Sequence, residues 1–191
     1  SMTELIEGIL KKTGGKDRSI RWFREKVKEL GEVPPQRLIR EGIVTARPTF
    51  GTMNFFMYSP KNKDNVDILP YYDRFPLVMP IEQYNNGFLG LNFHYLSIPM
   101  RLKLLNIISE YASNDKLDET TRIRLTWNRV KRNPIVKPTV KRYLADHVRT
   151  AFRRINADEM MVAVLLPVQR FVRATETKVY ADSRMSANRR G

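Results

Sequence analysis

Arginine and lysine side chains are concentrated in residues 121–154 of this 191-residue chain. That stretch carries eleven cations and one acid, which gives it a net charge of +10. Most of the cations are arginines, whose planar guanidinium suits the oxygens of a phosphate better than a lysine ammonium does. The stretch therefore predicts a surface for double-stranded DNA phosphates, formed by Arg122, Arg124, Arg129, Lys131, Arg132, Lys141, Arg142, Arg149, Arg153 and Arg154.

The whole chain is strongly basic, with a formal charge of +14 and a pI of about 10.2. A charge of this size favours a polyanion as partner, and an acidic protein neighbour is the alternative. Trp127 and Tyr143 lie among the cations and can stack on bases, although a place in the core is the simpler interpretation. The sequence has no helix-turn-helix, zinc-finger or RNA-recognition pattern, so it does not predict base-specific readout.

Three acidic residues, Asp115, Asp118 and Glu119, are close enough in sequence to suggest a Mg²⁺ site of a nuclease. Their spacing matches no calcium-binding loop, and a helix cap is the favoured role for Asp118 or Asp115. His94 and His147 are interpreted as partly buried histidines with satisfied hydrogen bonds. With no cysteine and no catalytic motif, the sequence predicts a binding protein without catalytic residues, metal or cofactor. No apolar run approaches the roughly 20 residues of a membrane helix, so no membrane partner is expected.

The central stretch, residues 50–100, is rich in aromatic residues and turn signals. Asn85, Asn86 and Gly87 tolerate the backbone of a tight hairpin turn, and apolar segments lie on both sides of them. Gly90, inside the second of these segments, indicates a bulge or a close approach of another chain segment. We predict a small curled antiparallel sheet or a partial barrel here, which a strand at 160–172 can join.

Basic helices are predicted on both sides of this sheet, so the fold class is α+β. We expect helices over 1–12, from the candidate caps Asp17 and Ser19 to Leu30, from Ser97 or Pro99 onward and over 140–155. The residues after Pro34 are interpreted as a linker or a short helix. A short helix is the interpretation of 120–130, where the apolar spacing does not settle the period, and the tail is interpreted as a short helix followed by a disordered basic end. The expected division is a basic helical extension at 1–48, an α+β core domain at 49–175 and a basic tail at 176–191.

Several segments of the chain carry a resemblance. In the central stretch they are YSPK at 58–61, LPYYDRFPLV at 69–78 and GFLGLNFHYL at 87–96, and outside it WF at 22–23, FVRA at 171–174 and DS at 182–183. Together they are similar to the DNA end protector proteins of T4-like tailed phages and cyanophages.

This resemblance implies a minor virion protein that caps the end of the packaged genome and shields it from host exonuclease. It implies location in the virion, with the host cytoplasm during assembly, and other virion proteins of the portal, neck or tail as partners. An oligomer is compatible with it, and no catalytic residue is transferred by it. The alternative is a structural neck, connector or tail component that contacts acidic neighbours and has no activity on DNA ends.

Overall fold

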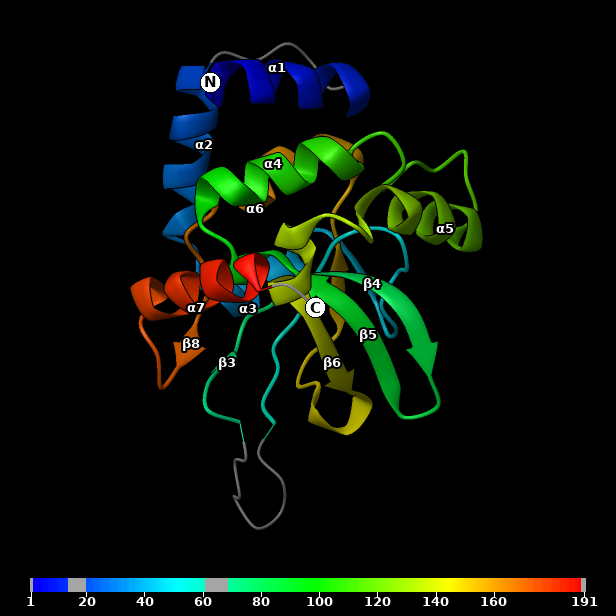
Figure 1. The fold of residues 1–191 in the computed structure, drawn as a ribbon, viewed down its shortest axis with the longest axis vertical. Helices are drawn as coiled ribbons and strands as arrows, with labels where there is room; N and C mark the ends of the chain where they lie inside the picture. Colours follow the sequence, from blue (N-terminus) through cyan, green and yellow to red (C-terminus); the bar gives the residue numbers. More distant parts are fainter. Residues whose placement is uncertain (1, 14–19, 61–68, 190–191) are drawn as a thin grey trace.

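The computed structural model describes residues 2–13, 20–60 and 69–189, which form an antiparallel sheet with helices packed on it (Figure 1). Helices α1 (Met2–Thr13), α4 (Ile98–Ile108) and α6 (Met160–Leu165) lie above the sheet in this view. The mixed α and β composition that the sequence predicts is confirmed.

Among the described residues, six strands form one sheet in which every neighbouring pair is antiparallel. In spatial order they are β1 (Ile43–Thr45), β7 (Phe152–Arg154), β2 (Asn54–Phe55), β4 (Leu77–Tyr84), β5 (Gly87–Asn92) and β6 (Val140–Leu144). No pairing joins β1 to β6 within the described part of the chain, so the sheet is open. A separate pair consists of β3 (Tyr72–Asp73) and β8 (Phe171–Val172).

The predicted hairpin is confirmed, because β4 and β5 are joined by the two residues Asn85 and Asn86. Gly90 pairs with Pro80, directly before a shift in the register of the two strands. A Cβ atom at Gly90 would lie 2.3 Å from Cγ1 of Val78. The close approach predicted for this glycine is therefore present, and the bulge lies opposite it, in the partner strand β4.

The predicted helix over 140–155 is wrong. These residues form β6, a 3-10 turn at Ala145–His147 and β7. The apolar residues fit a helical period, but they are mostly β-branched or aromatic and they find partners across the sheet. Tyr143 lies opposite Phe88 of β5, and β7 pairs with β2. Tertiary strand pairing therefore overrides the local pattern.

The predicted strand over 160–172 is also wrong in its main part, because its first residues form α6. A capping box between Asn156 and Glu159 starts the chain into this helical segment, and Pro167 lies just beyond its end. Residues Met160 to Val164 are all buried, so no exposed face gives α6 a helical period in the sequence. The short strand β8 that follows pairs with β3 and does not join the main sheet.

The other helix predictions are confirmed. Besides α1 and α4, the structure has α2 (Ile20–Gly31), α3 (Pro35–Arg40), α5 (Glu119–Val130) and α7 (Glu176–Asn188). The candidate caps Asp17 and Ser19 lie outside the described residues. Within the segment 1–48, α1 packs on α4, α2 packs on α6, and β1 forms an edge of the sheet.

Both faces of the sheet are covered by apolar side chains. Leu77 and Met79 of β4 face the main core, which includes buried residues of α4 and α6. Val78, between them, faces a smaller aromatic cluster that contains Phe56, Phe88, Tyr143 and Phe152. Alternate residues of one strand thus enter two different cores, as the pleat of a strand requires.

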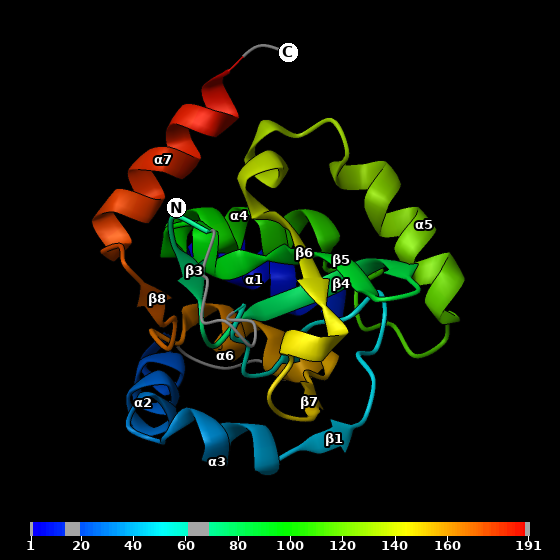
Figure 2. The same ribbon diagram turned by 90° about the horizontal axis from the view of Figure 1, so that it is seen from below.

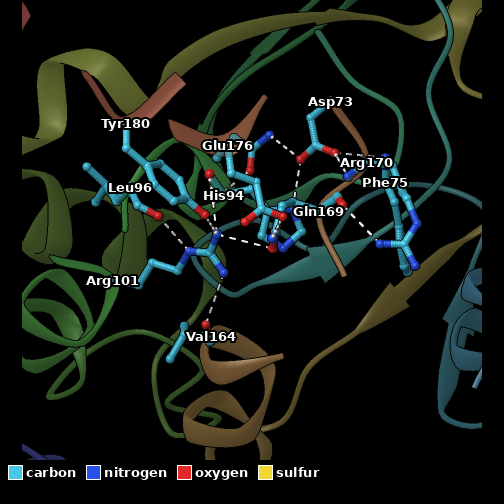
Figure 3. Close-up of polar contacts among 11 residues, drawn as sticks. Asp73, Phe75, His94, Leu96, Arg101, Val164, Gln169, Arg170, Glu176 and Tyr180 are labelled. Carbon is cyan, nitrogen blue, oxygen red and sulfur yellow. Dashed lines mark hydrogen bonds and ion pairs between the residues drawn. The ribbon is translucent and has the colours of Figure 1, made fainter. Parts of the chain in front are cut away.

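A buried polar network ties the β3–β8 pair to the main sheet (Figure 3). The carboxylate of Asp73, 3% exposed, accepts hydrogen bonds from the backbone N–H groups of Phe75 and Arg170, each at 3.0 Å. Its other oxygen accepts from the Asn92 amide at 3.1 Å and lies 2.7 Å from Nδ1 of His94. Burial alone would raise the pKa of Asp73, but His94 and these hydrogen bonds hold it below its ordinary value.

Arg101 of α4 is fully buried, donates to the carbonyl of His94 at 3.4 Å and is the second charge of the network (Figure 3). Its guanidinium donates to the carbonyls of Leu96 at 2.8 Å and Val164 at 3.3 Å. It also donates to the Tyr180 hydroxyl at 3.0 Å and to Oε1 of Gln169 at 3.3 Å. One side chain therefore fixes α4, α6, α7 and the segment before β8 relative to one another.

Replacing Arg101 by methionine is expected to destabilise the fold by about 3 kcal/mol or more, because buried oxygen atoms lose their donor. The measurement is the free energy of unfolding in urea. Lys103→Met is the matched control on the same helix, since Lys103 is exposed, and it should change stability by less than about 0.5 kcal/mol. Equal, small effects of the two substitutions would contradict the role given to Arg101.

Stability should also fall as the pH drops below about 6.5. Burial lowers the pKa of His94, although the Asp73 carboxylate acts in the opposite direction. The unfolded chain therefore takes up a proton on His94 that the folded chain refuses, so this stability is complete above the unfolded pKa and decreases below it. Urea unfolding between about pH 7 and pH 5 measures it. His94→Gln should flatten the pH dependence. An equally steep pH dependence in this variant would show that a group other than His94 causes it.

Candidate nucleic-acid interface

Four of the cations predicted to contact DNA lie on α5 or just after it. Asp118 caps this helix by accepting a hydrogen bond from the Thr121 N–H at 2.7 Å, which confirms the predicted cap. The four cations, all exposed, are Arg124, Arg129, Lys131 and Arg132. Arg129 pairs with Glu110 at 2.5 Å, whereas no ion pair of the described residues involves Arg124 or Arg132. This helix therefore presents cations to solvent.

Three further cations, Lys141, Arg142 and Arg149, lie on β6 and in the loop after it. Arg142 donates to Oδ1 of Asn86 at 2.9 Å and lies over the ring of Tyr84. Arg149 donates to the carbonyl of Ser59 at 3.3 Å. In Figure 1, β6 is at the lower centre and α5 at the upper right, so the two groups of cations occupy separate parts of the surface.

The last three predicted cations are bound to other parts of the chain. Arg122 is 5% exposed and donates to the carbonyls of Leu117 at 2.7 Å and Phe50 at 3.1 Å. Arg153 donates to the carbonyl of Leu38 at 2.6 Å and pairs with Glu159 at 2.9 Å. Arg154 pairs with Asp115. These guanidinium groups hold chain segments together, which the sequence alone does not distinguish from phosphate binding.

The two aromatic residues among the cations belong to the cores, as the simpler interpretation holds. Tyr143 is buried in the aromatic cluster, and Trp127 packs against the main core.

The three acids considered for Mg²⁺ also have other roles: Asp118 caps α5, Asp115 pairs with Arg154, and Glu119 pairs with Arg47 at 2.8 Å. Within the described ranges, no three histidine, aspartate or glutamate side chains are grouped to hold a metal ion.

A pocket of about 680 Å³ lies between the edge strand β6 and α7. Its walls combine tyrosines with cations: Tyr58, Tyr71, Tyr95, Tyr143, Lys141, Arg173 and Lys178. Figure 2 shows α7 on one flank of the molecule and α5 on the other, so this pocket is remote from the cations of α5. Among its lining residues only Lys141, Arg142 and Tyr143 are candidates from the cationic stretch.

Sequence reasoning missed Tyr71, Tyr95, Arg173 and Lys178 as site residues because they lie far apart along the chain. One signal was present. Five of the segments on which the resemblance rests, at 58–61, 69–78, 87–96, 171–174 and 182–183, each contribute a residue to the wall of this pocket.

Lys141 is the half-buried cation of the pocket. Its ammonium lies 3.9 Å from the centre of the Tyr95 ring, and burial lowers its pKa to about 8. Across the pocket, Tyr71 donates to a carboxylate oxygen of Asp182 at 3.0 Å. Burial, together with that carboxylate, raises the pKa of Tyr71 to about 12, so the phenol keeps its proton. The pocket therefore offers uncharged aromatic walls and a cation that an anion would stabilise.

The fold and this surface define a basic α+β protein with exposed cations and a cation-lined aromatic pocket. The chain belongs to the Phage T4 terminal DNA protecting protein family, whose model matches residues 5–189. No curated protein and no solved structure matches the chain. Of the helices that the structure describes, none has the length and apolar character to cross a bilayer.

The lowered pKa of Lys141 can be measured directly. We expect an NMR titration of the lysine side chains to show one resonance with a midpoint near pH 8, because burial disfavours the charged ammonium. Lys141→Gln should remove that resonance and leave the others in place. A midpoint near the ordinary lysine value of about 10.4 would show that Lys141 is well solvated.

Proposed function

We propose that this protein binds the ends of double-stranded DNA without regard to sequence and protects them from exonuclease, and that it does so without catalysis. The observation that carries this proposal is the membership of nearly the whole chain, residues 5–189, in the family of terminal DNA protecting proteins. In the phage particle, the protected end is the terminus of the packaged genome.

Electrostatics support this proposal. The net charge of +14 favours binding to a polyanion, and phosphate contacts need no base readout. The exposed cations of α5 and of the β6 region are the proposed phosphate contacts. The roles of Asp115, Asp118 and Glu119 in a cap and in ion pairs with arginines favour binding over metal-dependent cleavage. Neighbouring virion proteins of the portal, neck or tail are the proposed protein partners.

End binding is tested by comparing a blunt linear duplex with a closed circular duplex of the same sequence in a gel-shift experiment. Phosphate-driven binding should persist at about 50–100 mM salt, and the linear duplex should bind more tightly. Equal affinity for the two forms would mean that the protein binds duplex DNA in general and does not recognise its ends. No binding at all would favour the structural role of a neck or tail component.

Arg124 on α5 and Arg132 just after it have no ion pair within the described residues, and reversing both, in the variant Arg124→Glu with Arg132→Glu, should weaken DNA binding. Each phosphate contact that is lost should reduce the slope of log affinity against log salt by about 1. The charge-matched control is Lys103→Glu with Arg184→Glu, at exposed positions of α4 and α7. If both double variants weaken binding equally, net charge rather than the surface of α5 determines affinity.

A further inference from the structure

We propose that the pocket between β6 and α7 receives the 5′-terminal nucleotide of a DNA end, with its phosphate monoester at Lys141 and its base against the ring of Tyr71. This inference rests on the proposed function and deepens it, because it says what distinguishes an end from the interior of a duplex. The experiment below gives one result if the pocket assignment is wrong and a different result if the proposed function is wrong.

The size and the walls of the pocket suit a nucleotide. A volume of about 680 Å³ lies within the range of sites that hold small ligands. The rings of Tyr71 and Tyr95 lie nearly parallel, with centroids 6.2 Å apart and an angle of 27° between their planes. Tyr71 is the part-exposed ring of the two, whereas Tyr95 is buried with the Lys141 ammonium over its ring. A tyrosine face stacks on any of the four bases, so a base on Tyr71 needs no particular sequence.

The charges of the pocket favour an anion. Within the described part of the chain, Lys141 has no carboxylate partner and contacts the Tyr95 ring instead. Arg173 and Lys178 add two cations to the wall. The two carboxylates that line the pocket are both engaged: Asp73 lies in the buried network, and Asp182 binds Tyr71 and pairs with Lys178 at 3.0 Å. A phosphate would therefore meet an excess of positive charge.

Arg173, in the wall of the pocket, has an unusual backbone conformation and a side chain that links two segments of the chain. Arg173 has a positive φ of 66°, unusual for a residue other than glycine, and its guanidinium donates to the carbonyls of Leu69 and Pro70. This contact fixes the segment that carries Tyr71 against the segment that leads into α7. The segment that carries Tyr71 and the segment that leads into α7 are therefore held together at the wall of the pocket.

A terminal phosphate differs from the phosphates inside a strand in two ways that matter here. It is a monoester, which carries close to two negative charges at neutral pH, and it has chain attached on one side only. A pocket with walls on several sides can accept a phosphate at the end of a strand. An internal phosphate does not fit in the same way, because the strand continues on both sides of it. Occupancy of the pocket would thus give a preference for ends that general phosphate contacts cannot give.

The test uses a DNA hairpin with one blunt end, prepared with either a 5′-phosphate or a 5′-hydroxyl, and a closed dumbbell without an end. We expect the intact protein to bind the phosphorylated hairpin about tenfold more tightly than the hydroxyl form, the factor that one charge-assisted hydrogen bond contributes. Lys141→Gln should abolish this discrimination, and Lys103→Gln, an exposed lysine on α4, should retain it.

The outcomes separate the two proposals. If both hairpins bind equally and better than the dumbbell, end binding stands and the phosphate pocket is wrong. If hairpins and dumbbell bind alike, the proposed function itself fails. A free nucleoside 5′-monophosphate carries the same base and phosphate as a DNA end, so it tests whether a free nucleotide is the ligand instead. Its competition at micromolar concentration would make a free nucleotide, rather than a DNA end, the ligand of this pocket.

The intact protein also provides a test that needs no substitution. The preference for the phosphorylated hairpin should decline as the pH rises through about 8, because Lys141 loses its proton there. A preference unchanged up to about pH 9 would overturn the assignment to Lys141. The other titratable and charged groups that line the pocket comprise five tyrosines, two aspartates and three cations. Burial raises the pKa values of Tyr58, Tyr71, Tyr95 and Tyr143, the fifth tyrosine is Tyr72, the pKa values of Asp73 and Asp182 are lowered, and the cations are Arg142, Arg173 and Lys178.

Discussion

The structure depends on the buried network of Asp73, His94 and Arg101. Two opposite charges removed from water are tolerated only because nearly every polar atom around them is hydrogen-bonded. The network connects β3, the turn after β5, α4 and α7. Tyr95 follows His94 directly, and Tyr72 precedes Asp73, so two walls of the pocket are attached to this buried network. Its stability and the shape of the candidate site are therefore linked.

Much of the fold follows from local signals in the sequence. The β4–β5 hairpin is predictable because its turn residues accept the required backbone, and α5 because Asp118 caps it. The stretch 140–155 misleads because its apolar spacing fits a helix, while the partners that make it strand lie in β5 and β2. The stretch 160–172 misleads because a helix buried on all sides shows no period.

The candidate site was predictable only in part. Sequence identifies a cationic stretch, but it does not separate the exposed Arg124 from Arg122, whose guanidinium binds carbonyl groups inside the fold. Burial decides between these roles, and burial depends on the three-dimensional packing. The pocket is harder still, because residues from five distant segments form its wall. Its distinguishing feature, a half-buried lysine over a tyrosine ring, exists only after β6 and the turn carrying Tyr95 have come together.

In the proposed function, the protein protects DNA ends by occupying them. The direct test is the rate at which a double-strand exonuclease degrades a blunt linear duplex with and without saturating protein. Occupied ends should stop degradation from both ends, while a nuclease that cuts within the duplex should still cleave the same DNA. Unchanged exonuclease degradation at saturation would contradict it, and so would equal protection from both enzymes, because that would mean coating of the whole duplex.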